Sequence, residues 1–139
     1  MCRLAPDSQI PAWATERGFF CVARTAEELS IVCDEDRVPD GILAEKGWVA
    51  LKLEGPFPFS MTGVLASFIQ PLADAGIPIF AISTFDTDYG LVKNADLERA
   101  QKALNEAGHR GCLSETTLHA KDRPLPSASS RWHNRSAAK

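Results

Sequence analysis

Histidine is nearly missing from this sequence, and the three that occur lie near its end: His109, His119 and His133. Nucleophilic and hydrolytic catalysis needs a base beside a serine or cysteine, and many metal sites use imidazole ligands. The chain before His109 contains no histidine, and no P-loop or GxGxxG motif occurs anywhere. The sequence therefore predicts a protein that is not an enzyme and that uses no cofactor or metal.

Long apolar runs and paired cysteines are also lacking. No stretch approaches the roughly 18 apolar residues that a membrane span needs, and Met1–Leu4 does not begin a signal-peptide core. The cysteines show no CxxC spacing; they are Cys2, Cys21, Cys33 and Cys112. We therefore expect a cytoplasmic protein with reduced thiols, no zinc site and no contact with a membrane.

The chain carries little net charge, but the charge is unevenly distributed. A net charge of −3, with 45% hydrophobic and 24% charged residues, is typical of a globular protein. Residues 114–139 hold five basic and two acidic side chains, together with a Pro- and Ser-rich run, and we predict that they form a disordered basic tail. The acidic remainder argues against nucleic-acid binding by the folded part.

The middle of the chain carries the clearest secondary-structure signals. Alternating side chains at 48–53 predict a half-buried strand, and apolar residues at helical spacing predict a helix over 62–75. Gly76 has the position of a helix C-cap. A short apolar run at 77–82 and a second run at 89–92 predict two strands joined by a polar turn.

Weaker patterns complete a second, similar set of elements. We predict a solvated turn at Asp34–Arg37 and a short link at 42–46. Further strands are expected at 1–6, 19–25, 28–33 and 110–113, and helices at 8–13 and 95–107. The first half then looks like a shortened copy of the second, and the order of elements predicts an α+β fold with a largely antiparallel sheet.

Two loops in this plan carry polar groups suited to a small zwitterion. Thr62-Gly63 begins the long helix, where free backbone N–H groups favour a carboxylate. The turn Thr84-Phe85-Asp86-Thr87-Asp88 offers two carboxylates for an ammonium or guanidinium group. The alternative is purely structural, because aspartate at a turn also accepts hydrogen bonds from nearby backbone N–H groups.

The middle of the chain resembles the ACT domain, a βαββαβ module of ferredoxin-like fold that binds small ligands. It is most similar to short bacterial ACT proteins related to the eukaryotic cytosolic arginine sensor. The resemblance covers about half the chain. It rests on Glu54-Gly55-Pro56, Thr62-Gly63-Val64-Leu65, Pro71–Ile77, Ile82–Tyr89 and Leu91-Val92.

The resemblance implies two ACT-like units, a truncated one at 1–46 and an ACT domain at 47–113. It also implies an amino-acid site, because positions matching Thr84, Phe85 and Asp88 line the ligand pocket of the sensor relatives, as does the glycine near Gly63. Candidate ligand-binding residues are Thr62, Gly63, Val64, Thr84, Phe85, Asp86 and Asp88. Where the sensor has a glutamate that contacts the ligand's side chain, this sequence has apolar Val64 and Leu65. The resemblance therefore does not identify which amino acid binds.

These features together predict a cytoplasmic amino-acid sensor without catalytic activity. The ligand would lie between two ACT units, within one chain or across a homodimer, and the regulated protein would be a separate and unknown partner. The alternative is an interaction module without a ligand, which would bind a partner protein through its sheet edge or its basic tail.

Overall fold

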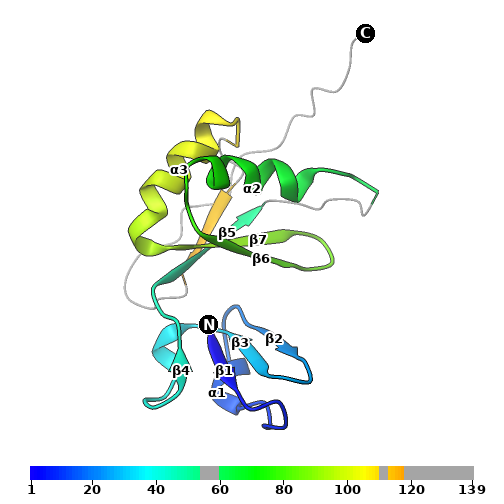
Figure 1. The fold of residues 1–139 in the computed structure, drawn as a ribbon, viewed down its shortest axis with the longest axis vertical. Helices are drawn as coiled ribbons and strands as arrows, with labels where there is room; N and C mark the ends of the chain where they lie inside the picture. The colour runs from blue at the N-terminus through cyan, green and yellow to red at the C-terminus, as the bar shows by residue number, and fades with distance from the viewer. Residues whose placement is uncertain (54–59, 110–112, 118–139) are drawn as a thin grey trace.

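The protein is built from two four-stranded antiparallel sheets that follow one another along the chain (Figure 1). This computed structural model describes residues 1–53, 60–109 and 113–117. The strand orders are β2-β3-β1-β4 in the first sheet and β6-β7-β5-β8 in the second. Each unit therefore has the same arrangement of strands, which confirms the predicted α+β, ferredoxin-like fold with antiparallel sheets.

The first unit is a reduced version of this plan. Its elements are β1 (Cys2–Leu4), α1 (Ala12–Thr15), β2 (Cys21–Arg24), β3 (Leu29–Val32), η1 (Glu35–Arg37) and β4 (Leu43–Ala44). The helix starts after Pro11 and has no side-chain cap, so it begins later than the predicted start at residue 8. A 3-10 turn replaces the expected acidic loop, and β4 forms in the stretch that we expected to be a link.

The second unit carries the full-length helices. It comprises β5 (Trp48–Leu53), α2 (Val64–Asp74), β6 (Ile79–Ser83), β7 (Asp88–Lys93), η2 (Asn94–Asp96), α3 (Leu97–Glu106) and β8 (Leu113–Thr117). The left-handed Gly76 (φ 67°) follows α2, and the N–H of Ile77 donates to the Leu72 carbonyl at 2.9 Å, as the predicted C-cap requires.

The last strand lies farther along the chain than the sequence indicates. We predicted a strand around 110–113 and a tail from residue 114, whereas β8 pairs with β5 from Leu113 to Thr117. Residues 114–117 show no apolar alternation, so the sequence pattern missed this part of the strand. Residues 110–112 of the predicted strand lie outside the described residues. The remainder of the predicted tail, 118–139, lies outside the described residues.

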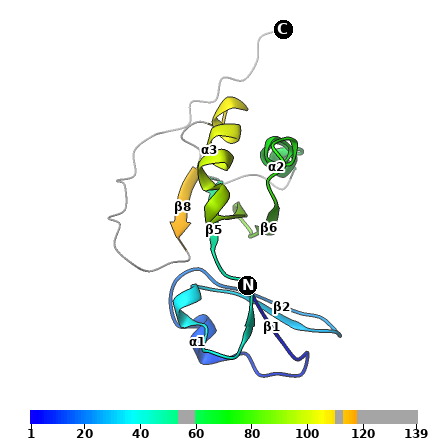
Figure 2. The ribbon, with the colours of Figure 1, turned by 60° about the vertical axis from the view of Figure 1, so that its left-hand side comes forward.

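Helices α2 and α3 cover one face of the second sheet (Figures 1 and 2). Phe68 and Leu72 of α2 and Ala100 and Leu104 of α3 are fully buried there against Leu51 of β5. Burial on this scale stabilises by about 1.5–3 kcal/mol for each large side chain. This core fixes the position of α2 above the β6–β7 hairpin.

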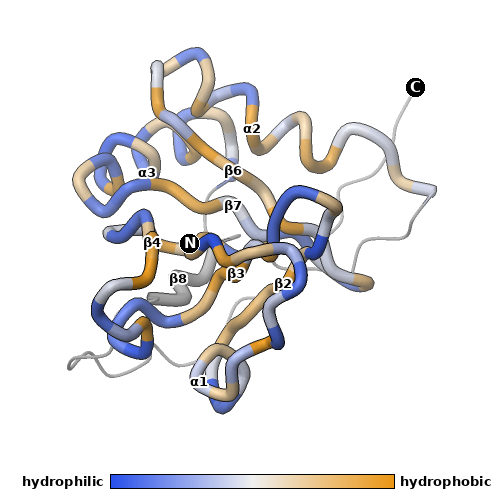
Figure 3. The backbone as a smooth tube through the Cα atoms, turned by 60° about the horizontal axis from the view of Figure 1, so that its bottom comes forward, coloured by the Kyte–Doolittle hydropathy of each residue, from blue (hydrophilic) through white to orange (hydrophobic). Residues whose placement is uncertain are grey.

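The opposite face of the second sheet packs against the first unit, below it in Figure 1. Val32 of β3 lies in a cluster with Ala50 and Leu91, and the rings of Phe19 and Tyr89 are 4.5 Å apart. Ala50 is completely buried, so the prediction of a half-buried strand at 48–53 is wrong: β5 is covered on both faces. Apolar colour is not confined to the interior, because β4 is also hydrophobic in Figure 3 and its Leu43 is 70% exposed.

The segment joining the units is held from both sides. The Gly47 N–H donates to Oε2 of Glu35 in the first unit at 2.7 Å, and the Gly47 carbonyl accepts from the Asn94 N–H in the second at 2.8 Å. Lys93, at the end of β7, donates to the Glu45 carboxylate at 3.0 Å and to the Lys46 carbonyl at 2.7 Å. The two units are therefore connected by polar contacts as well as by the apolar cluster.

Candidate functional site

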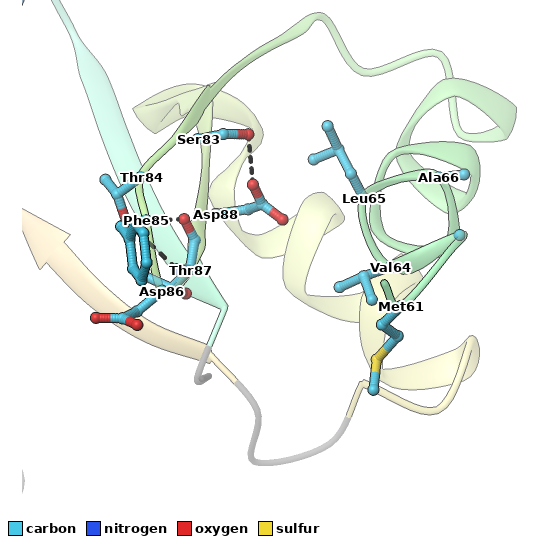
Figure 4. A pocket seen from close by; sticks show the side chains of 11 residues that line it. Met61, Val64, Leu65, Ala66, Ser83, Thr84, Phe85, Asp86, Thr87 and Asp88 are labelled. Atoms are coloured by element: carbon cyan, nitrogen blue, oxygen red, sulfur yellow. Dashed lines mark hydrogen bonds between the residues drawn. The ribbon is translucent and has the colours of Figure 1, made fainter. Parts of the chain in front are cut away.

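A cleft of about 330 Å³ opens between the N-terminal end of α2 and the turn that joins β6 to β7 (Figure 4). Among the described residues, all those that line it belong to the second unit. They are Met61, Gly63, Val64, Leu65, Ala66, Ser83, Thr84, Phe85, Asp86, Thr87 and Asp88. Six of the seven predicted ligand-binding residues are in this set. The exception is Thr62, which is exposed next to Gly63 and does not line the cleft.

The turn between the strands is fixed by its own hydrogen bonds. The backbone N–H and the hydroxyl of Thr84 donate to the Thr87 carbonyl at 2.8 and 2.9 Å. The Thr87 hydroxyl donates to the Leu53 carbonyl at the end of β5. Thr84 and Thr87, rather than the aspartates considered from the sequence, therefore fix the turn that forms one wall of the cleft.

Asp88 is the carboxylate that faces α2. It is paired with Ser83 across the β6–β7 ladder, and the Ser83 hydroxyl donates to its Oδ1 at 2.5 Å. Figure 4 shows the second carboxylate oxygen directed toward the side of the cleft formed by Val64 and Leu65. A negative group is thus oriented by a neighbour and can accept hydrogen bonds from an ammonium group.

Asp86 and Phe85 lie on the other side of the same turn. Both side chains point away from α2 in Figure 4, and Phe85 is 78% exposed. The sequence predicted two carboxylates acting together, but the structure separates them, because residue 86 lies at the tip of the turn and residue 88 has already entered β7. Only Asp88 faces the interior of the cleft.

The opposite wall is the start of α2. Gly63 occupies the N-cap position in a left-handed conformation (φ 80°), and no side chain caps the helix. Its carbonyl accepts the first helical bond, from the Ser67 N–H at 2.8 Å. The first N–H groups of a helix have no partner within the helix, so this end presents donors and partial positive charge to the cleft.

Sequence reasoning missed five lining residues, of which Ser83 matters most because it orients Asp88. A four-residue turn at 84–87 implies that 83 and 88 are directly opposite each other, so the hairpin pattern could have identified this pair. Met61, Leu65 and Ala66 could not be assigned to a cleft without the path of the chain into α2. Leu65 follows the apolar helical spacing that predicted α2, so the sequence does not distinguish it from the residues that face the core.

The cleft has no contribution from the first unit among the described residues. A ligand held between the two units of one chain, one of the two arrangements expected from the sequence, therefore has no support at this cleft. Within the same described ranges, no three His, Cys, Asp or Glu side chains gather as a metal site, and no helix is long and apolar enough to span a membrane.

Two buried thiols lie away from the cleft, in the first unit. Burial raises the pKa of Cys2, and burial together with the nearby Cys2 raises the pKa of Cys33 to about 11. Both cysteines are almost fully buried. Since nucleophilic reactivity needs the thiolate, both cysteines act here as small buried apolar side chains.

Comparison with known proteins places this architecture in a family. The family model of the ACT domain matches residues 43–106. A second family model, described as an N-terminal domain, matches residues 1–41. The two matches meet at residues 41–43, where β4, the last strand of the first sheet, begins.

Two curated animal proteins are similar to part of the chain. The human protein CASTOR3P is 36% identical over 92 residues, which cover 57% of this chain and 56% of that protein. Subunit 1 of the bovine cytosolic arginine sensor for mTORC1 is 30% identical over 90 residues, which cover 57% of this chain and 27% of that protein. The chain thus spans about half the length of the first relative and about a quarter of the second.

A solved bacterial structure covers more of the chain. The crystal structure of protein Atu0741 from Agobacterium tumefaciens matches with a TM-score of 0.73 and 47% identity, over 77% of this chain and 80% of that one. The chain therefore contains an ACT domain at residues 43–106, is similar over part of its length to a cytosolic arginine sensor, and shares its fold with protein Atu0741.

Proposed function

We propose that this protein is a regulatory sensor that binds a free amino acid in the cleft between α2 and the β6–β7 turn. The observation that carries the proposal is the pairing of opposite electrostatic character across the cleft. Asp88, oriented by Ser83, faces the uncapped N-terminal end of α2 at Gly63. An α-amino acid carries one negative and one positive group, and this geometry matches both.

In the proposed complex, Asp88 accepts hydrogen bonds from the ligand's ammonium group, and backbone N–H groups after Gly63 donate to its carboxylate. Hydrogen bonds to charged groups contribute about 1.5–3 kcal/mol each. Two of them contribute about 3–6 kcal/mol, which corresponds to binding in the millimolar to tens-of-micromolar range. That range suits a protein that senses the concentration of a metabolite.

The proposal also covers the setting in which the sensor acts. Its bovine relative is cytosolic by name, and we infer the same location here. Binding would change how the second sheet packs, within the chain or against a second copy in a homodimer, and so alter contact with a separate regulated protein.

We propose units at 1–46 and 47–117, the second extended to the end of β8. No catalytic step is assigned to either unit.

The test is a thermal-shift screen of the purified protein against the twenty amino acids at millimolar concentration. A ligand at about 100 times its Kd adds roughly 2.7 kcal/mol to the free energy of unfolding, which raises the Tm by several degrees. Asp88→Asn should abolish this shift. Asp86→Asn, which removes the same charge from the outward side of the turn, is the matched control and should keep it.

Two results would contradict the proposal. A shift that survives in Asp88→Asn would place the ligand elsewhere. No shift with any amino acid would instead favour an interaction module that binds a partner protein without a ligand.

A further inference from the structure

The two walls of the cleft differ in chemistry. The hairpin wall is polar, with hydroxyls and Asp88, whereas the α2 wall is made of Met61, Val64, Leu65 and Ala66. No lysine, arginine or histidine lines the cleft among the described residues, and Asp86 is turned outward. The described residues therefore give the interior of the cleft one inward carboxylate and an apolar surface, and none of them offers a second inward charge to a ligand's side chain.

Leu65 is the residue that makes this wall distinctive. It lies on α2 beside Val64, but only Val64 packs against the core beneath the helix; Leu65 belongs to none of the hydrophobic clusters of the described residues. It is nevertheless half-buried, and Figure 4 shows its side chain reaching from the helix toward Asp88. A leucine directed into a cleft rather than into the core gives that cleft an apolar surface.

We propose that the cleft selects amino acids with an uncharged, apolar side chain, and that Leu65 determines this selectivity. The inference rests on the proposed function, since it presumes that an amino acid binds here. Once Asp88 takes the α-ammonium group, a guanidinium or ammonium at the end of the ligand's side chain would meet Leu65 and Met61 and lose water without a partner. An unpaired charge in such a place is disfavoured, whereas a methyl or thioether group gains from leaving water.

The size of the cleft agrees with a single amino acid. Small-molecule sites range from about 300 to 1,000 Å³, and a cleft of about 330 Å³ is at the lower end of that range. A ligand of the size of leucine or methionine fits this description, whereas a nucleotide or a peptide needs more room.

The experiment is a calorimetric titration of the full chain with leucine, methionine, alanine, arginine and glutamate. One methylene in an apolar pocket changes binding by roughly 10-fold to 200-fold, and the low end applies to an open cleft. We expect leucine or methionine to bind about tenfold more tightly than alanine or arginine. Equal affinities for all, or arginine as the tightest ligand, would overturn the proposal while leaving the sensor function in place.

Variants at Leu65 make the test specific. Leu65→Glu places a second carboxylate opposite Asp88, and we expect arginine to become the preferred ligand by about tenfold. Leu65→Gln introduces a side chain of nearly the same shape as glutamate but without its charge. It should weaken leucine binding without any gain for arginine. Leu65→Ala should bring the affinities for leucine and alanine close together. Unchanged selectivity in all three folded variants would remove the role of Leu65, and no binding of any amino acid to the wild-type protein would remove the sensor function itself.

Discussion

Gly90 marks the tightest packing under α2. A Cβ at this position would lie 2.7 Å from Cζ of Phe68 and closer still to Cε1, so only a residue without a side chain fits beneath the fully buried ring. Gly90→Ala should lower the free energy of unfolding by about 1–3 kcal/mol, the usual effect of overpacking a core. Urea denaturation measures the change.

A second variant tests whether the Phe68 ring causes the loss of stability in Gly90→Ala. Phe68→Leu removes the atoms that the new methyl would meet, so adding Gly90→Ala to a Phe68→Leu background should cost less than adding it to the wild type. If both backgrounds lose the same stability, the contact with Phe68 does not explain why glycine is needed here.

Cys33 gives a prediction about pH. Its pKa rises from 9.0 to about 11 in the folded protein, because burial and the adjacent Cys2 oppose the thiolate. Between these values the unfolded chain binds fewer protons than the native one, so raising the pH favours unfolding. This contribution to stability is complete below about pH 9 and is lost as the pH rises through about 11.

The measurement compares urea unfolding near pH 8 and near pH 10.5 in the wild type and in Cys33→Ala. Lysines also titrate in this interval, so the informative quantity is the difference between the two proteins. We expect stability to fall more steeply with pH in the wild type. Parallel pH profiles would show that the Cys33 thiol is not responsible.

At the scale of elements, α2 contains a proline that breaks its hydrogen-bond pattern. Pro71 has no N–H, which leaves the Ser67 carbonyl without its helical donor. Nε2 of His109, just after α3, lies 2.9 Å from that carbonyl, and its ring meets Phe68 edge-on. With the proton on Nε2, a residue just after α3 supplies the bond that the proline removed.

This compensation predicts a coupling between two distant positions. His109→Phe keeps an aromatic ring against Phe68 but removes the donor, and should cost about 1 kcal/mol of stability. In a Pro71→Ala background, residue 71 can donate to Ser67 itself, so the same change should cost clearly less. A double-mutant cycle by chemical denaturation measures the coupling, and equal costs in the two backgrounds would refute it.

Elements could be predicted from the sequence where apolar residues repeat strongly. The bounds of β5 were predicted fully, and α2 and β7 within two residues, because Phe68, Leu72 and Leu91 follow clear periods. The two-residue β4 and the polar β8 carry no such pattern and exist because β1 and β5 offer them edges. Burial of Ala50 depends on packing against the first unit, which no local pattern reveals.

The sequence also predicted only part of the candidate site. Turn-forming residues and a glycine at a helix start identified Asp88 and Gly63, because these signals are local. Which of the two carboxylates faces α2 depends on the pleat of β7, and the role of Leu65 depends on how α2 is rotated over the sheet. Neither can be decided without the three-dimensional packing.

For the whole molecule, the apolar contact between the sheets predicts that the two units unfold together. Val32 belongs to the first sheet but is buried against Ala50 and Leu91 of the second. Val32→Ala should cost about 2 kcal/mol and should reduce hydrogen-exchange protection in β7 as much as in β3. Leu43→Ala, at an exposed position, should change neither. A loss confined to the first unit would show that the units are independent.

Trp48 lies in the apolar contact between the two units. It is paired with Lys93, at the end of β7 that is far from the cleft. Its ring lies 4.8 Å from that of Phe80 and 4.3 Å below the ammonium group of Lys93, and its indole N–H is buried with no partner among the described residues. Indole emission responds to nearby charge and to solvent. Lys93 ends the strand that Asp88 begins, so a movement of β7 would alter the electric field at the indole. The protein thus contains a native fluorophore placed to report, without any label, whether an event in the cleft reaches the contact between its two halves.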